Sequence, residues 1–290
     1  MSEMRDRIDP LITERAPWLY SSIPGVRLLR GLLHLALGYD RTVEIAERLK
    51  DAPSPQIMDE MADRLAKLVV SEGLRHIPKE GPALIVVNHP TGIADGIMMW
   101  HVIRSIRPDM YFFANSDILR IMPQMSDTIC PVEWREDKRS RVKTRETLAY
   151  VKEATVQGRL GIIFPSGRLA KRRKLKLHER DWMPSAAMLA RKFDLPVIPV
   201  NVQARNSALF YLFDKLHPTL RDVTLFHETL NKDRQPYRIT VGPPIQAAQI
   251  PKDDGIAYLK RKTLALGGAD APAVSLVRMT RSPFLSRPAD

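Results

Sequence analysis

A histidine and an aspartate six positions apart have the residue types and the spacing for acid–base chemistry. His89 follows a short apolar run at residues 84–87, and Asp95 follows the turn-forming residues 90–92. Such a turn lets the chain reverse tightly, so the Asp95 carboxylate can reach back to the imidazole. A carboxylate on one ring nitrogen fixes the tautomer and leaves the other nitrogen free to take a proton. The spacing therefore predicts a general base, His89, oriented by Asp95. The plainer alternative is a helix-capping histidine with an aspartate that the helix dipole favours.

No serine or cysteine adjoins His89 as an evident nucleophile. Cys130, the single cysteine, follows a different apolar segment and has no base nearby in the sequence. Direct general-base catalysis therefore fits these residues better than a covalent enzyme intermediate.

A second apolar run, at residues 160–164, ends in a loop that carries a cation. The loop reads Phe164-Pro165-Ser166-Gly167-Arg168. Its proline and glycine predict a turn, and the forked guanidinium of Arg168 suits a phosphate or carboxylate. The loop is a candidate anion site, although an ordinary strand-to-helix turn with a surface arginine would look the same.

These loops need strands and helices to position them, and residues 76–250 supply an alternation of the two. The pattern predicts strands at 83–87, 110–113, 128–132, 160–164, 197–202 and 238–241, and helices at 93–106, 142–157 and 184–193. Alternation of this kind predicts an α/β fold with a largely parallel sheet flanked by helices. Reactive groups gather at the carboxyl ends of such strands, where both His89 and the 164–168 loop would lie.

Two further segments flank this α/β domain. Residues 1–75 are expected to be helical, with a leucine-rich helix after Pro24-Gly25 and a second helix over 55–73. The leucine-rich helix either packs against the core or lies in a membrane interface. Residues 251–290 are expected to form a C-terminal helix and an irregular tail.

Composition limits the possible classes of protein. The chain has 290 residues, 44% hydrophobic and 27% charged, which is typical of a globular protein. One cysteine excludes a disulfide framework and a zinc site built from several thiolates. No signal peptide or membrane-spanning stretch is visible, so we expect a cytoplasmic location. A net charge of +12 indicates an anionic partner or surface, and much of the excess lies in residues 168–180, unless that run is simply a solvated face.

Three motifs together resemble the glycerophospholipid acyltransferase family, which includes the 1-acylglycerol-3-phosphate acyltransferases. They are residues 88–95, residues 163–168 and the segment Leu195-Pro196-Val197-Ile198-Pro199-Val200, and the resemblance covers roughly residues 70–245. It implies the fold of these acyltransferases and acyl transfer from an acyl thioester, with His89 as base and Asp95 as its partner. The donor would be acyl-CoA or acyl carrier protein, used as a substrate, with no cofactor and no metal. The implied substrate-binding residues are Asn88, Thr91, Gly92, Phe164, Pro165, Ser166, Gly167 and Arg168.

Two departures from the usual family pattern bear on the acceptor. Five residues instead of four separate His89 from Asp95, which is similar to a subgroup of ornithine-lipid and haemolysin-like acyltransferases. The usual Phe-Pro-Glu-Gly-Thr-Arg motif has lost its acid to Ser166 and lacks the threonine. Both departures point away from glycerol phosphate as the acceptor, and a lyso-lipid with another head group or an amine acceptor stays open.

The sequence thus predicts an O-acyltransferase of phospholipid metabolism that is peripheral to the inner face of the cell membrane. Two other classes stay open. One is a non-catalytic protein that binds anionic lipid or nucleic acid through its basic run, although that run lacks the interleaved aromatics typical of single-strand binders. The other is an acyl-thioester hydrolase, in which water replaces the acceptor at the same base.

Overall fold

A seven-stranded sheet forms the centre of the computed structural model, which describes residues 2–133, 140–216 and 218–277. The strand order is β1-β9-β8-β2-β5-β3-β4. The strands are β1 (Val69–Glu72), β2 (Ala83–Val87), β3 (Met110–Asn115), β4 (Ile129–Val132), β5 (Leu160–Ile163), β8 (Val197–Gln203) and β9 (Tyr237–Val241). Neighbouring strands from β8 to β4 run parallel, whereas β9 is antiparallel to β8 and β1 is parallel to β9. The predicted α/β fold with a largely parallel sheet is confirmed.

The central strands are apolar on both faces because helices cover both faces. In β2 all five residues are buried; Ala83, Ile85 and Val87 pack into one hydrophobic cluster, while Leu84 and Val86 pack into the other. The first cluster includes α4 (Ser54–Leu65) and α5 (Ile93–Ile103), and the second includes α7 (Arg141–Val156), α8 (Ser185–Lys192) and α11 (Gly255–Ala265).

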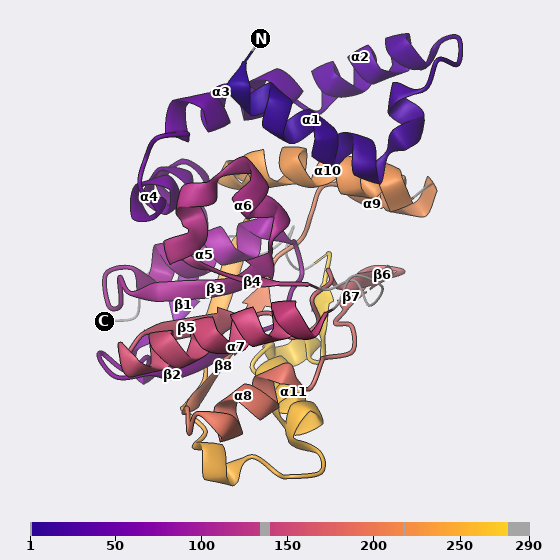
Figure 1. The fold of residues 1–290 in the computed structure, drawn as a ribbon. Coiled ribbons are helices and arrows are strands. Elements are labelled where there is room, and N and C mark those ends of the chain that lie inside the picture. The colour runs from indigo at the N-terminus through magenta and orange to yellow at the C-terminus, as the bar shows by residue number, and fades with distance from the viewer. Residues whose placement is uncertain (1, 134–139, 217, 278–290) are drawn as a thin grey trace.

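The N-terminal helices form a further layer outside α10 (Pro218–Leu230), and Figure 1 shows them at the end of the molecule opposite α8 and α11. They are α1 (Glu3–Arg15), α2 (Val26–Ala36) and α3 (Tyr39–Leu49). α1 and α3 join the main hydrophobic cluster. α2 buries Leu33 but leaves four leucines exposed: Leu28, Leu29, Leu32 and Leu35.

Two expectations about elements need correction, and the basic run forms an element for which no expectation was stated. The helix expected over residues 55–73 ends at Leu65, and β1 follows it as an edge strand of the main sheet. The basic run forms a hairpin, β6 (Lys171–Arg173) with β7 (Lys176–His178). The tail expected to be irregular after Gly267 contains β10 (Ala273–Ser275), which pairs with β7, while its last residues, 278–290, lie outside the described part of the chain.

Two helices escaped the sequence patterns altogether, α9 (Ala208–Leu216) and α10, which pack on each other between β8 and β9 in the chain. Among the described helices, none combines the length and the apolar character needed to cross a bilayer.

Candidate functional site

The two loops singled out in the sequence lie at the same edge of the sheet, because β2 and β5 are parallel neighbours. Asn88, directly after β2, is buried and extends the β2–β8 pairing with its side chain. Its Nδ2 donates to the Val202 carbonyl at 2.9 Å, and its Oδ1 accepts from the Val202 amide at 2.7 Å. Asn88 therefore fixes where the next residue, His89, leaves the sheet.

His89 and Asp95 form a hydrogen-bonded pair. The imidazole Nδ1 lies 2.9 Å from Asp95 Oδ2; the histidine side chain is 17% exposed and the aspartate is fully buried. A carboxylate is an acceptor only, so Nδ1 must be the donor and the neutral ring keeps the lone pair on Nε2. This is the protonation pattern that a general base requires.

The turn after His89 holds the Asp95 carboxylate in place. The amides of Thr91 and Gly92 donate to Oδ2 at 2.9 and 3.0 Å, and the Thr91 hydroxyl donates to Oδ1 at 2.6 Å. Since that hydroxyl has only one proton, Tyr237 of β9 must be the donor in its 2.6 Å contact with Thr91. Burial, followed by the charge of Asp95, raises the pKa of Tyr237 well above its ordinary value, so it stays a donor.

Gly92 meets a backbone requirement of this turn. Its φ is +101°, a region that residues with a Cβ rarely adopt, and an added Cβ would lie 3.3 Å from the Leu169 side chain. Gly92 thus shapes the approach to α5 and leaves room for the segment that follows the second loop.

The second loop contacts the histidine through its first residue. The Phe164 ring lies against the His89 imidazole, with 4.5 Å between ring centroids. Pro165 is buried and its carbonyl accepts from the Met183 amide at 2.9 Å. The Gly167 amide donates back to the Phe164 carbonyl at 2.9 Å, and the Ser166 hydroxyl lies 2.9 Å from the Arg168 carbonyl. The loop is a tight turn, and its Gly167 amide is used within it.

Arg168 is the one side chain of this loop that is exposed. Its guanidinium forms no hydrogen bond or ion pair with the residues that the structure describes. Two residues further on, the Ala170 amide donates to the His89 carbonyl at 2.8 Å, which brings this segment beside the histidine. The Arg168 guanidinium is therefore available to an anionic group, and its role in binding substrate stays a prediction.

The opposite side of the His89 peptide is held by Glu179. Its Oε2 accepts from the His89 amide at 3.0 Å, and its Oε1 accepts from the Trp182 indole at 3.0 Å. Burial raises the pKa of the Glu179 carboxyl, and hydrogen bonds from His89, Trp182 and Ser166 offset part of that rise.

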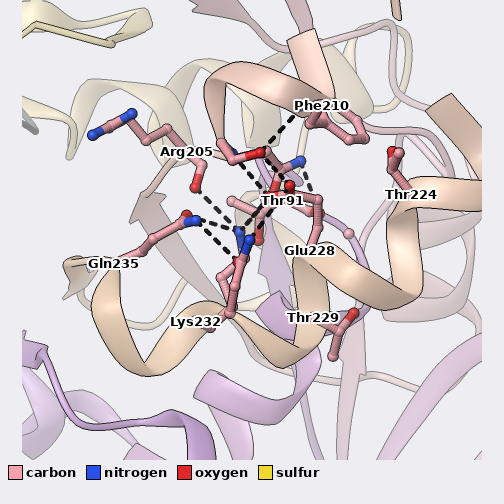
Figure 2. A network of polar contacts seen from close by, with 12 residues as sticks. Thr91, Arg205, Phe210, Thr224, Glu228, Thr229, Lys232 and Gln235 are labelled. Carbon is pink, nitrogen blue, oxygen red and sulfur yellow. Dashed lines mark hydrogen bonds and ion pairs between the residues drawn. The ribbon is translucent and has the colours of Figure 1, made fainter. Parts of the chain in front are cut away.

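A buried lysine lies behind the turn, at the centre of the network in Figure 2. Lys232 Nζ donates to Asn206 Oδ1 at 2.7 Å and to Gln235 Oε1 at 2.9 Å, and it lies 3.4 Å from Glu228. Asn206 in turn donates to the Thr91 carbonyl at 3.3 Å. Burial lowers the pKa of Lys232 to about 8, against the opposing effect of the Glu228 and Asp95 charges. The network joins the chain after β8 to the loop of the His89–Asp95 pair.

Sequence patterns did not find Glu179, Asn206, Lys232 or Tyr237. Each reaches the site from an element distant in the chain, and their residue types are common on surfaces. The basic run did mark the neighbourhood of Glu179, as the one acid among seven cations. Among the described residues, no three His, Cys, Asp or Glu side chains gather as a metal site would require.

Comparisons with known proteins find similarity to acyltransferases. Residues 68–203 match the family model described as Acyltransferase. The chain is 21% identical, over 82% of its length and 87% of the relative's, to a lyso-glycine lipid O-acyltransferase of Bacteroides thetaiotaomicron. It is 20% identical, over 82% and 85%, to the protein of the same name from Phocaeicola vulgatus. The crystal structure of the 1-acyl-sn-glycerophosphate acyltransferase PlsC from Thermotoga maritima aligns with a TM-score of 0.46 and 16% identity, covering 92% of this chain and 96% of that one.

Proposed function

We propose that this chain, which matches the Acyltransferase family model over residues 68–203, moves a fatty acyl group from an acyl thioester to the hydroxyl of a lyso-lipid. The observation that carries the mechanism is the 2.9 Å contact between His89 Nδ1 and Asp95 Oδ2 at the carboxyl edge of the sheet. It leaves Nε2 as the acceptor for the proton of the attacking hydroxyl.

The steps follow from that acceptor. The lyso-lipid hydroxyl gives its proton to His89 Nε2 while its oxygen attacks the thioester carbonyl. The tetrahedral intermediate then breaks its C–S bond, and the thiol leaves with the proton held by the imidazolium. Asp95 remains a carboxylate throughout and stabilises the charged ring. The products are the acylated lipid and a free thiol, CoA or acyl carrier protein.

The acceptor class is proposed from the motif at residues 163–168 and from the relatives. Ser166 stands where the family usually has an acid, and two relatives are named for lyso-glycine lipid, which is not a glycerol phosphate. We assign the acceptor to lyso-lipids of this kind, with Arg168 pairing with an anionic head group or with the donor's phosphate.

We further propose that the protein works at the cytoplasmic face of the membrane, attached through α2. The helix exposes Leu28 (71%), Leu32 (55%) and Leu35 (80%) along one face, and this face is an open, mostly apolar surface that also includes Arg27. Leucines beside cations are the composition of helices that lie in a lipid interface.

The test is acyl transfer from a long-chain acyl-CoA or the matching acyl carrier protein to a lyso-glycine lipid or a lyso-phospholipid. We expect His89→Ala to lower kcat by about 10²–10⁴-fold, the usual contribution of a general base, and Asp95→Asn to lower it by at least 10²-fold. His89→Ala should unfold at a temperature close to that of the parent protein. Undiminished turnover by His89→Ala would contradict the mechanism. Thiol release that needs no acceptor would identify a hydrolase instead.

A further inference from the structure

The basic hairpin, defined as residues 169–180, holds both peptide groups of His89. At its start the Ala170 amide donates to the His89 carbonyl at 2.8 Å, and at its end Glu179 Oε2 accepts from the His89 amide at 3.0 Å. The two ends are joined by the Lys171–His178 pairing and by a 3.0 Å bond from Arg180 Nε to the Leu169 carbonyl. The hairpin therefore holds the His89 backbone, from which the imidazole projects, by hydrogen bonds on both sides.

Of these contacts, the one made by the Glu179 carboxylate is not required for the hairpin itself to form. Glu179 is half-buried, and its two oxygens accept from different N–H groups, those of His89 and Trp182. An amide side chain has only one acceptor oxygen, so its NH₂ group would face one of these donors. The contacts thus specify a carboxylate and fix its orientation from both sides.

The place of this carboxylate is also informative. The family motif with an acid between proline and glycine has Ser166 there in this chain, and Ser166 lies close enough to Glu179 to lower the pKa of its carboxyl. Glu179 brings a carboxylate to this loop from thirteen positions further along the chain, at the far end of the hairpin.

We infer that Glu179 is a positioning residue of the site, which together with Ala170 fixes the His89 backbone and hence the line along which Nε2 meets the acceptor hydroxyl. The inference rests on the proposed role of His89 as general base. Glu179 touches no reacting atom in this scheme; it acts through the His89 peptide. Errors of about 1 Å in the position of a catalytic group can cost about 10²-fold in rate.

The test compares Glu179→Gln with Asp181→Asn. Asp181 is two residues away and fully exposed, and it contacts only Lys260 among the described residues, so its variant is a matched control. With the donor and acceptor pair that the wild type uses best, we expect Glu179→Gln to lower kcat about 10²-fold and to leave KM for the acceptor within about threefold. Hydrogen exchange at the His89 amide should become at least tenfold faster in Glu179→Gln, and neither quantity should change in Asp181→Asn.

If Glu179→Gln does not fold, two milder variants decide. Glu179→Asp keeps the charge but shortens the reach, and Trp182→Phe removes the donor that holds Oε1. Each should lower kcat roughly tenfold. Wild-type kcat and an unchanged His89 amide in the folded variants would overturn the inference.

The failure of this inference is distinguishable from failure of the proposed function. An inactive His89→Ala beside a fully active Glu179→Gln sinks the positioning role alone. An active His89→Ala sinks the general-base mechanism, and the amide exchange then still reports whether Glu179 holds the His89 backbone.

Discussion

Asp95 shows how much of this site is built from local chain geometry. Its two oxygens accept from the His89 imidazole, from the amides of Thr91 and Gly92 and from the Thr91 hydroxyl, all within six positions of the chain. A fully buried carboxylate is tolerated because every one of these donors points at it. The longer turn between His89 and Asp95 therefore closes on itself and keeps the pair in contact.

Tyr237 is the long-range partner of this turn, and its hydroxyl is the group to remove. Tyr237→Phe leaves the Thr91 hydroxyl without its buried donor, which should cost about 1–2 kcal/mol in the free energy of unfolding. We also expect kcat to fall several-fold, because Thr91 supports Asp95 directly. Urea unfolding and steady-state kinetics measure the two effects.

Tyr258→Phe on α11 is the control for that variant, since the Tyr258 hydroxyl forms no hydrogen bond in the described part of the chain. Equal stability and equal kcat in Tyr237→Phe and the wild type would show that the Thr91 contact has no influence on the pair.

At the scale of elements, α2 has an exposed apolar face that packs against no other described element. Replacing Leu28, Leu32 and Leu35 together by serine should weaken binding to vesicles of mixed phosphatidylglycerol and phosphatidylcholine by roughly 100-fold. The reason is that each leucine side chain contributes about 1 kcal/mol to binding when about half of it leaves water for the lipid interface. Vesicle co-sedimentation measures the change.

The matched control is Val156→Ser, which removes an equally exposed apolar side chain (82%) from α7. It should leave vesicle binding unchanged. Loss of binding in both variants to the same degree would argue against a specific α2 surface.

Sequence patterns predicted the buried strands well, because apolar runs such as residues 83–87 have few alternatives in an α/β chain. They failed where local signals conflict with tertiary pairing. Val69–Glu72 continues a helical spacing of apolar residues, yet it becomes a strand because β9 offers it a partner 168 residues away. The hairpin β6–β7 is almost entirely charged, so no hydrophobic alternation marks it.

The residues of the site also fall into some that the sequence predicted and some that it did not. His89, Asp95 and Phe164 could be predicted and lie together, since the ends of adjacent parallel strands must meet. Glu179 and Tyr237 could not, because their contacts depend on where whole elements fold back. Asn88 and Gly92 were predicted to bind substrate, and this stays a prediction. In the structure the Asn88 side chain bonds to Val202 of β8, and Gly92 lies at the start of α5.

For the molecule as a whole, the buried Lys232 makes stability depend on pH. Its folded pKa of about 8 lies below its ordinary value of 10.5, so the unfolded chain holds the proton more tightly. The contribution of Lys232 to folding stability is therefore full above pH 10.5 and is lost as the pH falls through 8. As the pH rises from 8 to 10.5, the unfolding free energy of the wild type should accordingly increase relative to that of Lys232→Met.

Chemical denaturation at several pH values measures this difference, with Lys260→Met, on an exposed ion pair, as the control that should show no such trend. A difference between wild type and Lys232→Met that is constant with pH would mean that Lys232 titrates alike in the folded and unfolded chains.

The pairing of β1 with β9 also has a consequence for synthesis on the ribosome. Glu72 and Thr240 meet across 168 residues, and β9 lies between β1 and β8 in the sheet. At a translation rate of about 5–20 residues per second, β9 is synthesised roughly 10–30 s after β1. Because Tyr237 lies on that same late strand, the support of Asp95 is incomplete until then. We expect a nascent chain stalled shortly before β9 to be sensitive to protease at residues 66–73 and to lack acyl transfer.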